Sequence, residues 1–431
     1  MDSPAYTPSR WTLLITALPV LLAGACIAVF GLNMPFVDQF RFIPTLAKAQ
    51  QGGLTFFDLF AQINEHRPII PRLIWLGLAA VSRYDVRWEL WADLLIAAGT
   101  FALLAVQVVR LWRQAGVAVP SMLLALMSLM AFNLAQWESW LQGFQTVMYA
   151  GTACMVIGLL GLARWQTWSG FALALLLGVI GTFSTANDLL YWPIGLVVIL
   201  MTAPAAGRLW RAFAWIGIGA ACFVAFFWGW RSTPGSDPAI LTTEFLPRLE
   251  WVANFLGAPV VSIPNLALPF GLLSILLFAL ITWRVGRLQM WSAAAPYLGI
   301  AAFVIATAVM ISMGRLRLGM VYAVTPRYLT ITAWYWVALL ALLPILPVPR
   351  IPQRIFYSLL AVVLLWHTAW GAFNARAMHA RMLPAYEAAL AGEPMTDEVL
   401  QGIAQSWQYD DARTWLKYLA DNRLSAYANA R

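Results

Sequence analysis

Long apolar stretches separated by short polar segments run along most of this 431-residue chain. Each stretch has about 20 residues and few charges, which is the length that a helix needs to cross a hydrocarbon core roughly 30 Å thick. Lipid offers no hydrogen-bond partners, so such a chain must close its backbone bonds within helices. The pattern predicts an all-α polytopic membrane protein with about eleven transmembrane helices, at residues 11–32, 89–109, 119–136, 146–163, 169–183, 189–203, 212–230, 262–283, 293–312, 328–347 and 355–372.

One further apolar stretch, residues 69–84, is too short for an ordinary span. Pro68 and Pro71 lie near its start, as is typical of the first turn of a helix. We interpret this stretch as an interfacial or re-entrant helix. The alternative is a short span, which would invert the side of every later segment.

The chain divides into two parts. Residues 1–372 form the predicted transmembrane domain, whose large outer loop at 33–88 contains two short amphipathic segments. Amphipathic helices lie flat on a membrane surface, where they can roof a cavity between the spans below. After residue 373, apolar residues recur at helical spacing among polar ones. We therefore expect a small helical extracytoplasmic tail at 373–431.

Composition agrees with lipid as the solvent. The chain is 61% hydrophobic and only 11% charged, whereas soluble domains carry roughly 25% charged residues. The net charge of +8 comes mostly from arginines scattered between the spans, in loops that hold no acid. This is the positive-inside pattern, so we expect a cytoplasmic N-terminus, carboxylates outside and no nucleic-acid partner.

The first outer loop holds the clearest candidate for a catalytic residue. Asp38 lies just beyond the first span, at the expected water boundary. A carboxylate there can take a proton from a hydroxyl nucleophile. The alternative interpretation is an ordinary solvated acid at a helix end.

Three adjacent residues near the end of the same loop, Glu65, His66 and Arg67, form a second candidate. Glutamate and histidine bind divalent metals, and arginine binds phosphate through two parallel hydrogen bonds. Neighbours in sequence do not share one face of a helix or strand, so the pattern does not establish a triad. A polar cap at the start of the following helix is the alternative.

Other segments expected outside add polar groups near the lipid boundary. Glu138 and Gln142 would share a face if their segment is helical. Outer arginines run against the positive-inside trend, so they need either a phosphate ligand or an acidic partner such as Glu138 or Asp188. The side chains that we expect around a lipid phosphate or a substrate are Arg72, Glu138, Gln142, Asn187, Asp188, Arg315, Arg327 and Tyr328.

The motifs of the outer loop resemble those of GT-C glycosyltransferases of the protein mannosyltransferase and aminoarabinose transferase type. The loop opens with Asp38-Gln39-Phe40-Arg41-Phe42, in the place of a DExRY-like motif, with Gln39 where the motif has its second acid. It closes with Glu65-His66-Arg67-Pro68, in the place of a Glu-Lys-Pro-Pro-Leu-like motif. The resemblance implies that Asp38 is the catalytic base and that Arg41 stabilises the loop or the headgroup. It also implies that Glu65, with His66, binds a divalent metal or the donor phosphate.

The resemblance implies sugar transfer from a polyprenyl-phosphate donor to a cell-envelope glycan or lipid acceptor. The expected place is the outer face of the bacterial cytoplasmic membrane. Two rival functions stay open: a flippase or transporter of lipid-linked glycans, and an O-antigen-type ligase or polymerase that uses a diphosphate donor. The chain has no Walker motif, no GxGxxG after a strand and no HExxH, which argues against a nucleotide-driven pump or a zincin.

Overall fold

A computed structural model describes residues 10–117, 121–231, 244–347 and 349–429. Within these residues the regular structure is helical, apart from an isolated antiparallel bridge between Ile63 and His66. Eight helical stretches of the described chain are long and apolar enough to cross a membrane. They are Arg10–Phe30, Arg87–Gln114, Gly143–Arg164, Arg208–Phe227, Ala267–Arg287, Trp291–Leu318, Pro326–Ile345 and Ile351–Ala391.

The main helices of these stretches are α1 (Arg10–Phe30), α5 (Arg87–Gln114), α8 (Thr146–Arg164), α11 (Arg208–Phe227), α14 (Ala267–Arg287), α15 (Trp291–Arg315), α16 (Leu329–Leu342) and α17 (Arg350–Ala391). Shorter helices lie between them: α2 (Ile43–Gln50), α3 (Phe56–Phe60), α4 (Ile69–Ser82), α6 (Ser121–Ala131), α7 (Trp137–Trp140), α9 (Trp168–Thr182), α10 (Tyr191–Thr202), α13 (Phe245–Gly257), α18 (Asp397–Leu400) and α19 (Tyr409–Asp421).

Three of the eleven expected spans fall on helices that are shorter than an ordinary span. The expected spans 119–136, 169–183 and 189–203 coincide with α6, α9 and α10, which have 11, 15 and 12 residues. Residues 119 and 120 lie outside the described chain. Helix α6 ends at Ala131, and the side chain of Asn133 then accepts a hydrogen bond from the Ala135 N–H and starts a 3₁₀ turn. An apolar run in sequence therefore overstates the length of a helix where a polar cap interrupts it.

The sequence pattern gave no signal for α13. Its 13 residues include Arg248, Glu250 and Asn254, which break the apolar run. The structure satisfies two of these polar side chains internally, since Arg248 donates to the Ser312 hydroxyl and Asn254 accepts from the Asn265 N–H. Helix α13 packs tightly on α14, because a Cβ at Gly257 or Gly271 would come within 2 Å of a backbone carbonyl oxygen of the other helix.

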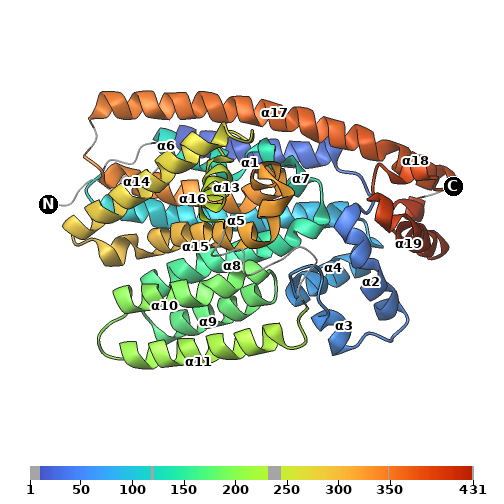
Figure 1. Cartoon of the computed structure of the whole chain (residues 1–431), viewed down its shortest axis with the longest axis horizontal. Helices are drawn as coiled ribbons and strands as arrows, with labels where there is room; N and C mark the ends of the chain where they lie inside the picture. Colours follow the sequence, from blue (N-terminus) through green and yellow to red (C-terminus); the bar gives the residue numbers. More distant parts are fainter. Residues whose placement is uncertain (1–9, 118–120, 232–243, 348, 430–431) are drawn as a thin grey trace.

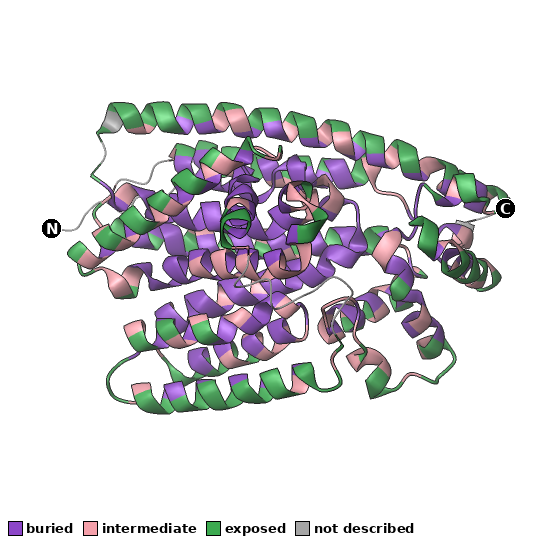
Figure 2. Ribbon diagram, viewed as in Figure 1, coloured by how far each residue is buried: buried purple, intermediate pink, exposed green. Residues whose placement is uncertain are grey.

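The bundle has a buried centre and an apolar outer surface. All fourteen residues of α16 are buried. Helices α11 and α17 have exposed residues along their length (Figure 2), and many of these are large and apolar. Soluble monomers rarely expose apolar patches of this extent. These faces suit contact with lipid tails, in agreement with a helical membrane protein.

The short helices of the first loop and of the tail gather at one end of the bundle, which we call the loop end. Figure 1 shows α2, α3, α4, α18 and α19 there, with the turn between α10 and α11 at the opposite end. Helix α4 has 14 residues and so measures about 21 Å, less than a hydrocarbon core. Residue 373, where the tail was expected to begin, lies inside a helix, because α17 runs without interruption from Arg350 to Ala391.

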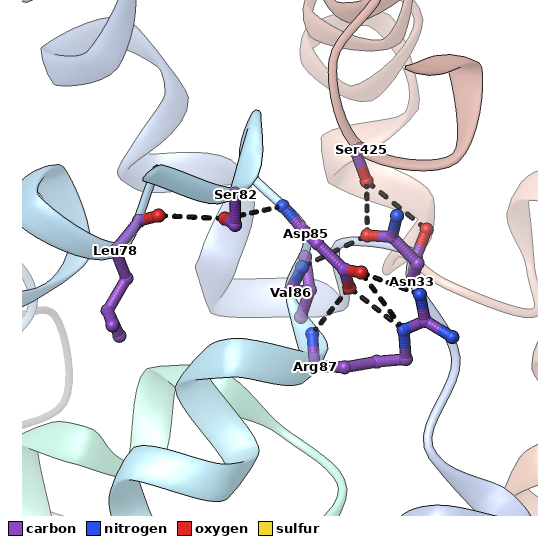
Figure 3. Close-up of polar contacts among 7 residues, drawn as sticks. All are labelled: Asn33, Leu78, Ser82, Asp85, Val86, Arg87 and Ser425. Carbon is purple, nitrogen blue, oxygen red and sulfur yellow. Dashed lines mark hydrogen bonds and ion pairs between the residues drawn. The ribbon is translucent and has the colours of Figure 1, made fainter. Parts of the chain in front are cut away.

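Asn33 joins the first loop to the tail (Figure 3). Its side-chain oxygen accepts from the Val86 N–H at 3.0 Å, and the Ser425 hydroxyl donates to that oxygen and to the Asn33 carbonyl, both at 3.2 Å. Beside this joint, Arg87 pairs with Asp85 at 2.6 Å. One buried asparagine thus connects the beginning of the loop, its end and the last turn of the chain.

Candidate functional site

Asp38 is carried by the 3₁₀ turn η1 (Val37–Arg41), and its neighbours fix that turn. The buried Gln39 side chain accepts from the Phe36 N–H and donates to Glu89 of α5 at 2.8 Å. Val37 has a φ of 45°, a left-handed conformation that is rare for a β-branched residue. The Val37 N–H donates to the Ile403 carbonyl of the tail at 2.8 Å. Strain of this kind persists only where surrounding contacts enforce it, and it is concentrated at functional sites.

A cavity of about 780 Å³ opens beside this turn, within the size range of small-molecule sites. It brings together eight of the residues that the sequence singled out: Asp38, Arg41, Glu65, His66, Asn187, Arg315, Arg327 and Tyr328. These come from four separate segments that the sequence placed outside. The structure therefore supports their grouping at a single site.

Three arginines line the cavity, and each lies beside a carboxylate. Arg315 is 3.1 Å from Glu65, whereas Arg41 is 3.8 Å from Asp38 and Arg327 is 3.8 Å from Glu138. The two longer separations are loose ion pairs, so these guanidinium groups keep donors for another anion. All three arginine side chains are 27–37% exposed, which leaves them accessible.

Tyr328 lies beside Arg327 in the cavity wall, which also holds Arg315. Tyr328 lines the cavity with both of them, and the Arg327 guanidinium lies over its ring, 5.6 Å from the centroid. The ring thus supplies an aromatic face beside the Arg327 cation.

His66 has a defined tautomer. Its Nδ1 accepts from the Ala186 N–H at 3.1 Å, so Nε2 carries the ring proton. Burial lowers the pKa of His66, although Glu65 and Asp38 act in the opposite direction. The ring is therefore neutral at pH 7 and donates, rather than accepts, at Nε2.

Glu138 contacts the site only through Arg327, and it lacks the helical partner that the sequence proposed. Helix α7 ends at Trp140, and Gln142 follows it as the residue before the next turn, so the two side chains do not share one helical face. Gln142 is buried and accepts from Gln145 at 2.9 Å. Burial raises the pKa of Glu138, which Arg327 opposes and Asp38 reinforces.

Five of the proposed site residues do not line the cavity: Arg67, Arg72, Glu138, Gln142 and Asp188. Arg67 donates to the carbonyls of Phe60, Phe226 and Trp228, and its guanidinium lies over the Phe60 ring. Arg72 donates to the carbonyls of Leu59 and Ala61. These two arginines hold main-chain segments together. Gln142 and Asp188 are buried behind the wall, the latter against Gly151 and Gly181.

The proposed metal site does not fit these contacts. A metal needs an imidazole lone pair, but Nδ1 of His66 is occupied by the Ala186 N–H and Nε2 carries a proton. Glu65 is paired with Arg315, whose charge would repel a cation. Among the described residues no group of three or more His, Cys, Asp or Glu side chains is placed to hold a metal.

Part of the cavity wall was not expected from the sequence. Its apolar side is formed mainly by the ends of α11 and α15, through Phe226, Phe227, Trp230, Met310, Ile311 and Met313. Two tail residues, Gln405 and Trp407, complete the polar side. In the sequence these apolar residues resemble those at the end of any other span. They face the cavity only because α11 packs beside the first loop.

Comparison with known proteins gives no family for this chain. No family model matches it, and the comparisons with curated proteins and with solved structures found no match.

Proposed function

We propose that this protein transfers a sugar from a polyprenyl-phosphate donor to a hydroxyl of a cell-envelope glycan or lipid. The observation that supports it best is the composition of the cavity. Two carboxylates, Asp38 and Glu65, and three arginines face a chamber whose other wall is apolar. This combination suits a ligand with an anionic headgroup and a hydrocarbon chain.

In the proposed reaction Asp38 is the general base. The acceptor oxygen attacks the anomeric carbon as Asp38 takes its proton, and a new carbon–oxygen bond forms with inversion. The bond from the anomeric carbon to the phosphate oxygen breaks, and the lipid phosphate leaves with the electron pair. Arg315 and Arg327 face the negative charge that develops there, which lowers the barrier.

The finer architecture that the sequence suggested fits this reaction. We propose a GT-C-like arrangement with eleven membrane crossings, in which α6, α9 and α10 cross as short helices and α4 lies on the surface. The loop end then faces outward, on the outer face of a bacterial cytoplasmic membrane. Grouping of four expected outer segments around one cavity supports this orientation.

The test is sugar transfer in proteoliposomes that contain a polyprenyl-phosphate sugar. Asp38→Asn should lower the rate about 100- to 10,000-fold, the usual effect of removing a general base. Asp85→Asn is a matched control, because Asp85 lies in the same loop, pairs with an arginine and has a side chain 17% exposed, as Asp38 does. A folded Asp38→Asn variant with full activity would refute the assigned role.

A diphosphate-linked donor is a second candidate, as in a ligase or polymerase. Three arginines around one chamber can hold two phosphates as well as one. Mass analysis of the released lipid separates the two, since it carries either one phosphate or two. Movement of the lipid-linked sugar across the bilayer with no bond cleavage would instead indicate a transporter.

A further inference from the structure

The C-terminal tail contributes an aromatic ring to the cavity. The 3₁₀ turn η9 (Ser406–Gln408) follows α18, and Trp407 and the adjacent Gln405 both line the chamber. The same region of the tail holds η1, through the hydrogen bond from the Val37 N–H to the Ile403 carbonyl. The tail is therefore tied to the turn that carries Asp38.

The Trp407 ring is exposed but fixed in place. Its side chain is 64% exposed, whereas Trp75, Trp140 and Trp251 are at most 1% exposed. The indole Nε1 donates to the Gln405 side chain at 2.6 Å. The Arg41 guanidinium lies over the ring, 5.6 Å from its centroid. A hydrogen bond at the edge and a cation over one face thus set the orientation of an indole that has no role in the core.

The surroundings of Trp407 suit a carbohydrate better than a hydrocarbon chain. A pyranose has one face of C–H groups that packs on an aromatic ring and a rim of hydroxyls that need hydrogen-bond partners. Trp407 offers the ring, while the amide of Gln405 and the guanidinium of Arg41 offer polar partners beside it. Apolar side chains that suit a lipid chain lie on the α11 and α15 side of the chamber instead.

We propose that Trp407, with Gln405 and Arg41, binds a sugar ring of the acceptor. This inference rests on the proposed glycosyl transfer and names the class of the acceptor, a glycan rather than a simple lipid. Arg41 lies over Trp407 and also 3.8 Å from Asp38. A sugar stacked on Trp407 therefore places its hydroxyls near the proposed base. Trp407 acts as a positioning and specificity residue.

The kinetic test measures the KM for the acceptor and the KM for the donor in separate titrations. Trp407→Ala should raise the KM for a glycan acceptor about tenfold, with the KM for the donor unchanged. Trp407→Phe should restore part of the loss, because it keeps an aromatic face. Trp283→Ala is the matched control, since Trp283 is 59% exposed and also lies under an arginine, Arg287, at 5.8 Å.

A binding test separates this inference from the proposed reaction. The protein in lipid nanodiscs is mixed with defined soluble oligosaccharides, without donor, and saturation-transfer NMR reports which sugar protons touch it. Binding by the wild type and by Trp283→Ala, lost in Trp407→Ala, supports the site even if no transfer is detected. Equal signals for all three proteins, no binding by any of them, or an equal rise in both KM values would overturn it.

Discussion

At the scale of single residues, His66 links the chemistry of the cavity to the stability of the fold. Its Nδ1 accepts from the Ala186 N–H, which holds the start of the turn before α10 against the first loop. Its proton on Nε2 gives the cavity a neutral donor. A protonated ring would break this arrangement, because Nδ1 would then face another N–H group.

Lowering the pH should therefore weaken the fold through His66. Its pKa is lowered in the folded state by burial, so below the unfolded value of about 6.5 the unfolded chain binds a proton that the folded chain does not. The stability that His66 contributes is present above that pH and is lost as the pH falls. His66→Asn keeps an oxygen acceptor for the Ala186 N–H but does not titrate in this range.

Thermal unfolding in detergent at pH 5 and pH 7 measures the effect. The midpoint of the wild type should fall more between these values than that of His66→Asn, while the other titrating groups, which both proteins share, cancel in the comparison. At pH 8 the His66 ring is neutral in both the folded and the unfolded state, so the unfolding midpoints of the two proteins should show the least pH dependence there. Equal pH dependence would show that His66 is not buried neutral.

The sequence singled out residues that the structure gathers around one chamber, but it did not show which polar residues are used for packing. Asp38, Glu65, Arg315 and Arg327 line one chamber, as their polar character near span ends suggested. Arg67 and Arg72 have the same character but point to main-chain carbonyls, which no local pattern reveals. Trp407 escaped notice because an aromatic residue in an amphipathic tail is typical of packing.

At the scale of elements, the joint at Asn33 decides whether the tail stays on the loop. Asn33→Ala leaves the buried Val86 N–H without its acceptor, which costs about 1–3 kcal/mol. The tail should then detach more readily, because the Ser425 hydroxyl also loses one of its two acceptors. Limited proteolysis after α17 and the unfolding midpoint measure the two consequences.

Ser425→Ala should have a smaller effect in the same assays, since it keeps the bond between Asn33 and Val86. Asn374→Ala is a control for asparagine loss, because that side chain bonds only locally, to the Trp370 carbonyl on its own helix. The loss of protease resistance and of the unfolding midpoint should be largest for Asn33→Ala, smaller for Ser425→Ala and smallest for Asn374→Ala. A tail that resists protease equally in all three variants would contradict the role of the joint.

Hydropathy predicted the existence of elements better than their lengths. Eight long helices match expected spans closely, because a long apolar run has few other structures available. The ends were less predictable: α17 continues to Ala391 beyond its expected apolar part, since polar residues also extend a helix in water. Helix α13 was missed because its arginine and asparagine are satisfied by partners distant in sequence.

At the scale of the whole molecule, the structure divides into a loop end with the cavity and an opposite end with the turn between α10 and α11 (Figure 1). The proposed reaction requires the loop end to face outward, where envelope glycans are. The charge pattern favours that orientation, since the arginine-rich turns connect the helices at their ends away from the cavity, where the positive-inside rule expects the cytoplasm. Orientation is a property of the protein in its membrane, so it needs a measurement in cells.

Labelling of single cysteines from outside the cell provides that measurement. Gln51 lies at the end of α2 and Ala206 in the turn between α10 and α11, and both are exposed. A membrane-impermeant maleimide should label Gln51→Cys in intact cells and Ala206→Cys only after the membrane is permeabilised. The native Cys26, Cys154 and Cys222 are buried, so the parent protein serves as a blank. Labelling of Ala206→Cys alone in intact cells would place the cavity in the cytoplasm, away from any envelope acceptor, and the proposed sugar transfer would have to be abandoned.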